Sequence, residues 1–143
     1  MSSNRDAYEQ GIGFYNAGDV EGLVSGYTED ATLVTPAGTF KGRAAIHEYR
    51  SREKAAFPDR TITLDVSVEQ GDTLAEEWTV AGTHTGPLVM PDGTEQPPTG
   101  KRIELKGMEL VRVRDGKIAV HHVYWDNMAF AGQLGLLPGG ATT

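Results

Sequence analysis

Asp115-Gly116 separates two long runs of strand-forming residues, and this pair constrains the fold more than any other feature of the sequence. An Asp-Gly pair between two such runs is typical of a two-residue type I′ turn, because both central positions of that turn require a positive φ. The flanking residues 101–114 and 117–126 are therefore predicted to form one antiparallel hairpin.

The two faces of this hairpin are predicted by counting outward from the turn. One face is expected to carry Val111, Val113, Ile118 and Val120 near the turn, and Glu109, His122, Tyr124 and Asp126 at the far end. An apolar surface that ends in a polar cluster is typical of a ligand cavity. The other face would carry Met108, Leu110, His121, Val123 and Trp125, and it is nearly as apolar. We therefore expect a homodimer, or a larger homo-oligomer, that buries one sheet face.

Helical periodicity dominates the first part of the chain and alternation dominates the rest. Helices are expected at 5–17, 20–27 and 43–56, and strands at 31–35, 39–41, 61–68, 74–85, 101–114 and 117–126. The alternation in 61–68 predicts one shared face for Ile62, Leu64, Val66 and Val68. This order indicates an α+β fold: three to four N-terminal helices packed on a curved antiparallel or mixed sheet around a cone-shaped cavity. We expect one domain spanning residues 1–143.

The composition limits the chemistry. The chain has 143 residues, a formal charge of −7 and no cysteine, which excludes disulfides, thiolate metal sites and cysteine nucleophiles. The acidic balance argues against nucleic acid as a partner, because phosphates need a basic face. The chain has no apolar run of signal-peptide or membrane-spanning type, so we expect a cytoplasmic protein with no membrane partner.

The histidines do not follow a metal-binding pattern. His121 and His122 are adjacent in a predicted strand, so their side chains point to opposite faces. His47 lies on a predicted helix with Arg43 and Arg50, which disfavour a nearby cation. The motifs of serine hydrolases and dinucleotide-binding proteins are missing from the sequence. We expect neither a metal nor another cofactor.

Asp126 is the strongest candidate for acid–base chemistry, because it follows the last predicted strand among aromatic residues. Such a carboxylate loses solvation, which should raise its pKa toward neutrality and let it take a proton from carbon and return it. The alternative is that Asp126 only caps the turn after the strand.

Two histidines are candidate catalytic partners of Asp126. His84 ends a predicted strand beside the proline-rich segment 87–99, where it either donates to a substrate oxygen or stabilises the turn. His122, predicted to face Glu109, either takes part in catalysis or only orders the sheet. The expected substrate-binding residues are Tyr15, Tyr49, Phe57, Trp78, Met108, Glu109 and Tyr124, of which Tyr124 is also a candidate donor to an enolate oxygen.

Several motifs occur in an order that is similar to one known family. They are Tyr15 to Asp19, Phe40-Lys41-Gly42, Trp78 to Leu88, Pro97 to Lys101, Asp115 to Ile118, Asp126, and Gln133 to Pro138. This order resembles the SnoaL-like polyketide cyclase family of the NTF2-like superfamily. The resemblance implies a cofactor-free enzyme of antibiotic biosynthesis, usually a homodimer, that closes a ring by intramolecular aldol condensation. It also implies that Asp126 is the acid–base residue and that Tyr15 lines the pocket.

Glu109 departs from the family pattern, in which neutral polar side chains occupy this strand. Two carboxylates close together would share a proton, which would suit an epoxide hydrolase or isomerase on the same fold. A third hypothesis is a non-catalytic module for small-molecule binding or dimerisation, since a fold does not determine a function.

Overall fold

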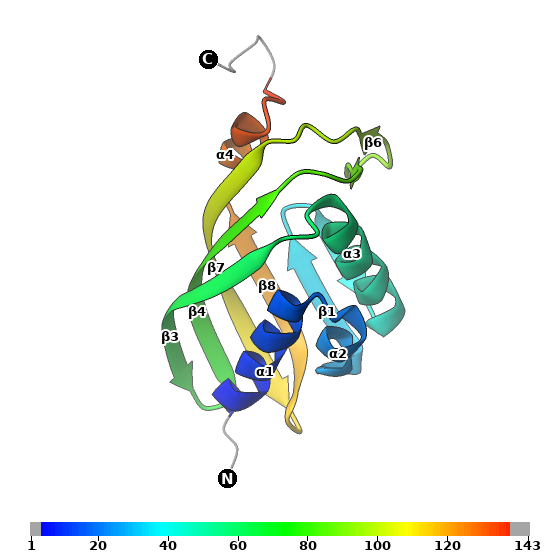
Figure 1. The fold of residues 1–143 in the computed structure, drawn as a ribbon. Coiled ribbons are helices and arrows are strands. Elements are labelled where there is room, and N and C mark those ends of the chain that lie inside the picture. Colours follow the sequence, from blue (N-terminus) through cyan, green and yellow to red (C-terminus); the bar gives the residue numbers. More distant parts are fainter. Residues whose placement is uncertain (1–3, 138–143) are drawn as a thin grey trace.

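A curved sheet of six strands packs its concave face against the first three helices (Figure 1). The structure, a computed structural model, describes residues 4–137; Pro138 of the final motif lies outside this range. The strands are β1 (Tyr27–Thr35), β2 (Gly38–Lys41), β3 (Thr61–Gln70), β4 (Thr73–Thr83), β7 (Arg102–Arg114) and β8 (Lys117–Trp125). Their order is β2-β1-β8-β7-β4-β3, and the sheet is mixed because β1 and β8 run parallel. The expected α+β class with a curved sheet is confirmed.

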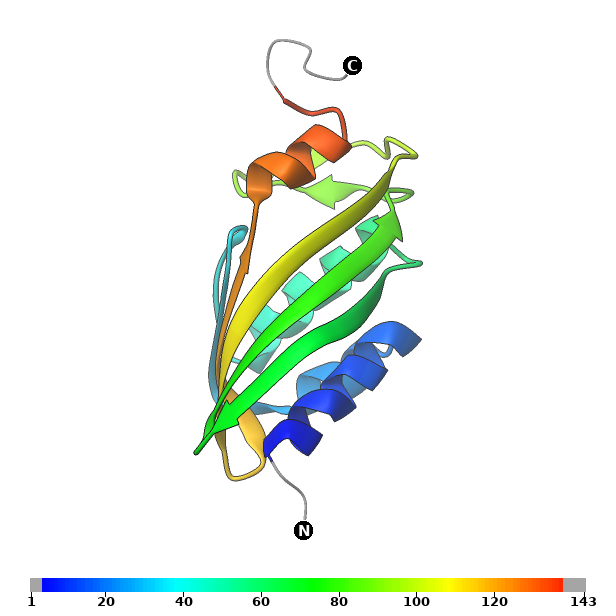
Figure 2. The same ribbon diagram turned by 90° about the vertical axis from the view of Figure 1, so that its left-hand side faces the viewer.

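The helices lie on one face of this sheet and at one of its ends (Figures 1 and 2). Helices α1 (Asn4–Ala17), α2 (Val20–Ser25) and α3 (Arg43–Ala56) cover the concave face. The fourth helix, α4 (Asn127–Gln133), directly follows β8 and is therefore C-terminal, although no helix was expected after the last strand. A short hairpin of β5 (Leu88–Val89) and β6 (Glu95–Gln96) lies at the same end as α4. None of the helices between residues 4 and 137 is long and apolar enough to cross a bilayer.

The turn between β7 and β8 has the predicted type I′ conformation. Both of its central residues have positive φ, 53° at Asp115 and 76° at Gly116. Beyond the turn, the register departs from simple counting, because Val113 pairs with Ile118 while Arg112 pairs with Val120. Residue 119 is therefore an extra residue, and it exchanges the two faces of β8 from that point on.

This bulge changes which side chains meet on the concave face. His121, Val123 and Trp125 now share that face with Glu109, whereas His122 and Tyr124 lie on the convex face. The predicted placement of His122 and Tyr124 beside Glu109 is therefore wrong. A second register shift, between Leu64 and Val66 of β3, moves Val66 and Val68 to the convex face and corrects the single face predicted for this strand.

The apolar core lies between the concave face and the helices. Its larger cluster joins residues of α1, α2 and α3 to the inner side chains of the sheet, and a smaller cluster lies under α4. Packing is tight at Gly107 of β7, where an added Cβ would lie 2.4 Å from the ring of Trp78. Gly13 of α1 is exposed and has no atom within 4 Å of an added Cβ.

These two glycines give a matched test of the packing. We expect Gly107→Ala to lower the free energy of unfolding by about 1–3 kcal/mol, because the methyl group overpacks the site. Gly13→Ala should instead raise it by about 0.5–1 kcal/mol, because alanine favours a helix interior. Urea unfolding followed by circular dichroism measures both. A neutral effect of Gly107→Ala would contradict the described packing of Trp78 on β7.

Candidate active site

A cavity of about 370 Å³ lies between the concave face of the sheet and the helices. Most of its lining is apolar or aromatic, and it comes from α1, α3, α4 and all the long strands as well as from the β5 segment. Of the residues predicted to bind substrate, Tyr15, Tyr49, Phe57, Trp78 and Glu109 line this cavity. Their placement is confirmed, and their role in binding stays a prediction.

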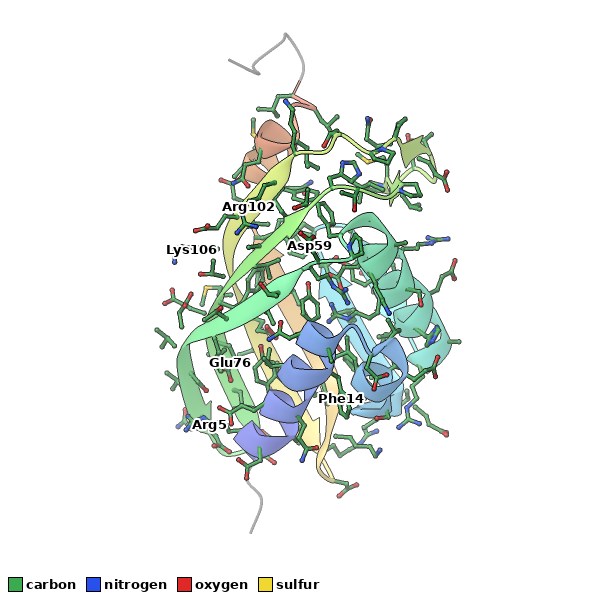
Figure 3. All side chains as sticks on the ribbon, viewed as in Figure 1. Arg5, Phe14, Asp59, Glu76, Arg102 and Lys106 are labelled. Carbon is green, nitrogen blue, oxygen red and sulfur yellow. The ribbon has the colours of Figure 1, made fainter. Side chains whose placement is uncertain are left out.

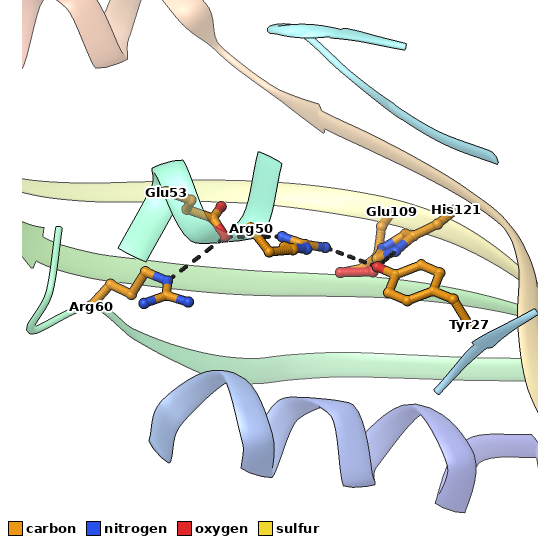
Figure 4. Close-up of polar contacts among 6 residues, drawn as sticks. All are labelled: Tyr27, Arg50, Glu53, Arg60, Glu109 and His121. Carbon is orange, nitrogen blue, oxygen red and sulfur yellow. Dashed lines mark hydrogen bonds and ion pairs between the residues drawn. The ribbon is translucent and has the colours of Figure 1, made fainter. Parts of the chain in front are cut away.

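A buried ion pair forms the polar part of the cavity wall (Figure 4). Glu109 of β7 and His121 of β8 are 4% and 5% exposed, and the imidazole Nε2 contacts Glu109 Oε2. The hydroxyl of Tyr8, from α1, donates to the other carboxylate oxygen, Oε1, at 2.7 Å. Both oxygens of this buried carboxylate are therefore paired, as burial of a charge requires.

The network continues from His121 to Tyr27 and Arg50. The Tyr27 hydroxyl lies 2.7 Å from His121 Nδ1, and Arg50 Nη2 donates to the same hydroxyl oxygen at 3.0 Å. Tyr27 begins β1, which pairs in parallel with β8, and Arg50 projects from α3 across the cavity. Three elements that are distant in the sequence thus bring a phenol, an imidazole and a guanidinium together.

The charges in this network reinforce one another. Burial disfavours the imidazolium of His121, but Tyr27 and Glu109 outweigh burial and raise the pKa of His121 to about 9. Burial also raises the pKa of Glu109, yet His121 and the Tyr8 hydrogen bond outweigh it and hold that pKa below its ordinary value. At neutral pH the pair is therefore charged, with a carboxylate and an imidazolium.

The buried tyrosines Tyr8 and Tyr27 are shifted in opposite directions. Burial and the neighbouring Glu109 carboxylate raise the pKa of Tyr8, so its hydroxyl remains a donor. Burial would also raise the pKa of Tyr27, but Arg50 and His121 outweigh burial and lower it. Two donors to one phenol oxygen stabilise its phenolate form and so favour loss of the phenol proton.

Asp126 does not lie in this cavity. It is exposed and caps α4, with Oδ1 accepting from the backbone N–H groups of Met128 and Ala129, both at 3.0 Å. The prediction of a desolvated carboxylate is wrong, and the capping alternative is the one observed. The reason is the bulge at residue 119. After it, odd-numbered residues of β8 such as Trp125 lie on the concave face, so Asp126, which follows the end of the strand, is directed away from that face.

The other predicted catalytic and binding residues are also displaced. His84 is buried outside the cavity lining, where its Nδ1 accepts from the backbone N–H of Thr99 at 3.1 Å and anchors the segment before β7. This is the turn-stabilising alternative for His84. His122 pairs with Leu110, not with Glu109, on the convex face. Met108 and Tyr124 are exposed on that same face, so neither lines the cavity.

Four polar residues of the site were missed in the sequence, namely Tyr8, Tyr27, Arg50 and His121. A signal existed for Arg50, because the predicted helix places Ile46, Tyr49 and Glu53 on one side and Arg50 lies among them. An arginine within such an apolar stripe indicates a buried cation with a partner. Within residues 4–137, no group of three or more His, Asp or Glu side chains could hold a metal ion.

Glu76 is a second buried carboxylate, and it pairs with Glu109 across β4 and β7. It lies near Arg5 of α1 (Figure 3), and Ser67 links the two residues by accepting from Arg5 Nε and donating to Glu76 Oε1, both at 3.0 Å. The other oxygen, Oε2, has no hydrogen-bond partner among the described residues. Burial, together with Glu109, raises the pKa of Glu76 to about 7, although the Ser67 hydrogen bond opposes the shift.

This shift predicts how stability depends on pH. The folded protein favours protonated Glu76. The contribution of this group to the free energy of unfolding is therefore complete below the ordinary pKa of 4.5, and it is lost as pH rises through about 7. We expect Glu76→Gln to unfold at a higher temperature than the wild type at pH 8.5, with a smaller difference at pH 5. The exposed Glu95 of β6 supplies the control, and Glu95→Gln should change the unfolding temperature far less than Glu76→Gln at pH 8.5. Calorimetry at both pH values measures this, and an equal effect of Glu76→Gln at both would contradict it.

Comparison with known proteins identifies similar sequences and structures. A family model described as a SnoaL-like domain matches residues 8–121. No curated protein sequence matches the chain significantly. The crystal structure of IdmH, a candidate polyketide cyclase from Streptomyces antibioticus, is similar with a TM-score of 0.76 and 30% identity, over 94% of this chain and 99% of that one.

More distant structures have the same fold. AclR, a candidate hydroxylase from Streptomyces galilaeus, has a TM-score of 0.79 at 23% identity, over 94% of this chain and 82% of that one. A candidate SnoaL-like polyketide cyclase from Jannaschia sp. CCS1 has a TM-score of 0.81 at 14% identity, over 94% of this chain and 93% of that one. At these identities the similarity concerns the fold alone.

Proposed function

Because the chain belongs to the SnoaL-like family and has the NTF2-like fold, we propose that it is a cofactor-free acid–base enzyme acting on a hydrophobic, carbonyl-bearing small molecule. The observation that carries this proposal is the hydrogen-bonded series of Tyr27, His121 and Glu109 on the wall of a largely apolar cavity. The similarity to IdmH supports a substrate of polyketide type and a place in secondary metabolism.

The proposed reaction is an intramolecular aldol-type ring closure. The phenolate oxygen of Tyr27 removes a proton from the carbon next to one carbonyl of the substrate. The enolate carbon forms a bond to a second carbonyl carbon, whose π bond breaks to leave an alkoxide. The Tyr27 hydroxyl then returns the proton to this alkoxide. Atoms and charge balance within one substrate molecule, so the enzyme is regenerated at the end of the cycle.

Each neighbour of Tyr27 has a distinct task in this scheme. His121 and Arg50 donate to the phenol oxygen and stabilise its charge before the substrate reacts. Glu109 keeps the imidazole protonated, and Tyr8 fixes that carboxylate. The apolar walls exclude water and orient the two carbonyl groups, which contributes several kcal/mol to catalysis in such reactions.

The epoxide hydrolase or isomerase alternative has less support. That chemistry requires a carboxylate that holds a water molecule, and both Glu109 oxygens already accept hydrogen bonds from Tyr8 and His121. The predicted partner carboxylate, Asp126, caps α4 on the outside. Glu76, which is beside Glu109 and has an unpaired oxygen, is not among the residues that line the cavity. A non-catalytic binding module is distinguished from an enzyme by the experiment that follows.

Proton removal can be measured without knowledge of the natural substrate. We expect the wild type to accelerate deuterium uptake from D₂O into the acidic carbon of 2-tetralone, a hydrophobic ketone, followed by NMR. Tyr27→Phe should reduce the catalysed rate by at least about a hundredfold, the usual scale for a positioned acid–base group. Asp126→Asn serves as the control and should leave the rate unchanged, because asparagine also caps helices.

Two results would count against this assignment. A wild-type rate equal to the buffer rate favours the binding module. If the exchange rate is unchanged in Tyr27→Phe but falls to the buffer rate in Asp126→Asn, the acid–base residue is Asp126 and not Tyr27.

We also propose that the protein is a homodimer that buries the convex face of its sheet. This face carries exposed apolar side chains in two rows that cross neighbouring strands. The first row consists of Val66, Glu77, Met108 and Tyr124. The second row consists of Val68, Ala75, Leu110 and His122. Val68 and Tyr124 are both 58% exposed, and such a surface, apolar except for Glu77 and His122, is typical of an interface. A two-fold pairing of the rows would cover both copies at once.

Native mass spectrometry tests the dimer. The wild type should be dimeric at micromolar concentration, and Leu110→Glu should be monomeric because it places a charge at the centre of the apolar rows. Ala44→Glu, on the exposed side of α3, is the control and should remain dimeric. A monomeric wild type, or a dimeric Leu110→Glu, would show that the convex face is not the interface.

A further inference from the structure

The guanidinium of Arg60 is a buried cation in the wall of the cavity, and its N–H donors are not used by the described part of the chain. Arg60 is 3% exposed, and none of its nitrogens, Nε, Nη1 and Nη2, has a hydrogen-bond partner among the described residues. Its nearest opposite charge is Glu53 Oε1, 3.7 Å from Nε, which is too long for a hydrogen bond. Buried charged groups are normally paired and hydrogen-bonded, so this arrangement requires an explanation.

Glu53 accepts a hydrogen bond from Arg50 but none from Arg60. The same Oε1 atom accepts from Arg50 Nη1 at 3.1 Å, so one carboxylate serves two guanidinium groups. Deeper in the cavity, Glu109 is already matched by His121. The Arg60 end of the cavity therefore keeps N–H donors without an acceptor, although Glu53 lies nearby (Figure 4).

We propose that the cavity binds a ligand with a planar, two-oxygen anionic group of carboxylate type, held by Arg60. This inference rests on the proposed function for the position of the reacting atoms, because it describes another part of the same ligand. A guanidinium offers parallel N–H donors in a rigid fork, which pairs with both oxygens of a carboxylate, whereas a neutral amide offers only one acceptor oxygen and no charge. The anion supplies hydrogen-bond acceptors that the described residues do not provide.

The surroundings of Arg60 fix its guanidinium as a rigid receptor. The guanidinium carbon lies 4.3 Å from the ring centroid of Tyr15, a cation–π contact that covers one of its flat faces. An added Cβ on Gly82 would lie 3.3 Å from Arg60 Cα, so the backbone is closely packed there. The donors at the edge of the guanidinium remain unused, and a preorganised donor set binds an anion with little loss of side-chain entropy.

The position of Arg60 also orients the ligand. Arg60 and Tyr27 lie toward opposite ends of the polar series, with Arg50 between them (Figure 4). The apolar lining near Arg60 includes Phe57 and Ile62, which suits an aromatic or aliphatic body attached to the anionic group. A ligand anchored at Arg60 would thus extend its remaining groups toward the Tyr27 oxygen.

Isothermal titration of a matched ligand pair tests the proposal. The probes are 2-naphthoate and its neutral isostere 2-naphthamide, which differ in charge but hardly in size. The wild type should bind 2-naphthoate at least about tenfold more tightly, as a charge-assisted pair with arginine implies. Arg60→Gln should abolish this preference and leave 2-naphthamide affinity within about twofold, since the apolar walls are unchanged. Arg112→Gln, on the exposed side of β7, should retain the preference.

The remaining outcomes each decide the proposal. Equal affinities in the wild type, no binding of 2-naphthoate, or an unchanged preference in Arg60→Gln would overturn it, with ordered water as the partner of Arg60 instead. If Arg60→Gln does not fold, Arg60→Met decides in the same way, because methionine fills an apolar site but carries neither the charge nor the donors and should therefore lose the preference. 2-Tetralone carries no anionic group, so failure of its deuterium exchange and failure of this binding test are separate results.

Discussion

The buried pair of Glu109 and His121 is the interaction on which the site depends. Removing two charges from water costs several kcal/mol for each ion unless every polar atom finds a partner. Here the carboxylate is completed by Tyr8 and the imidazole by Tyr27, so residues of α1, β1, β7 and β8 are tied together inside an apolar cone. The same pairing that makes burial tolerable also places two donors on the Tyr27 oxygen and lowers its pKa. Stability and proposed chemistry therefore have one physical origin.

The two ends of the cavity differ in how their charges are satisfied. At the Tyr27 end every charge has a hydrogen-bonded partner, which suits a group that must hold one geometry while a proton moves. At the Arg60 end the guanidinium N–H donors have no partner among the described residues, which suits a group that binds a ligand. A protein that compensated Arg60 internally would be more stable but would lose an anchor, which is the usual conflict between stability and function.

The sequence predicted the elements better than it predicted their faces. The Asp115-Gly116 turn and the bounds of α3 follow from local chemistry, and both are as expected. The extra residue in β8 leaves no local signal, yet it moves His121 into the cavity and His122 out of it. Tyr27 joins the site only because β1 pairs in parallel with β8, a contact between residues far apart in the sequence. Asp126 caps α4, and this helix was not predicted because its residues Asn127 and Gly132 have weak helical preference.

The protonation state of His121 tests the central claim most directly. Nitrogen-15 NMR of the labelled protein distinguishes an imidazolium, with both ring nitrogens protonated, from a neutral ring. A buried ion pair with Glu109 and Tyr27 predicts that His121 remains an imidazolium at pH 7.5 and titrates near its pKa of about 9. A neutral His121 ring at pH 7.5 would contradict the charged network and remove the basis for a phenolate at Tyr27.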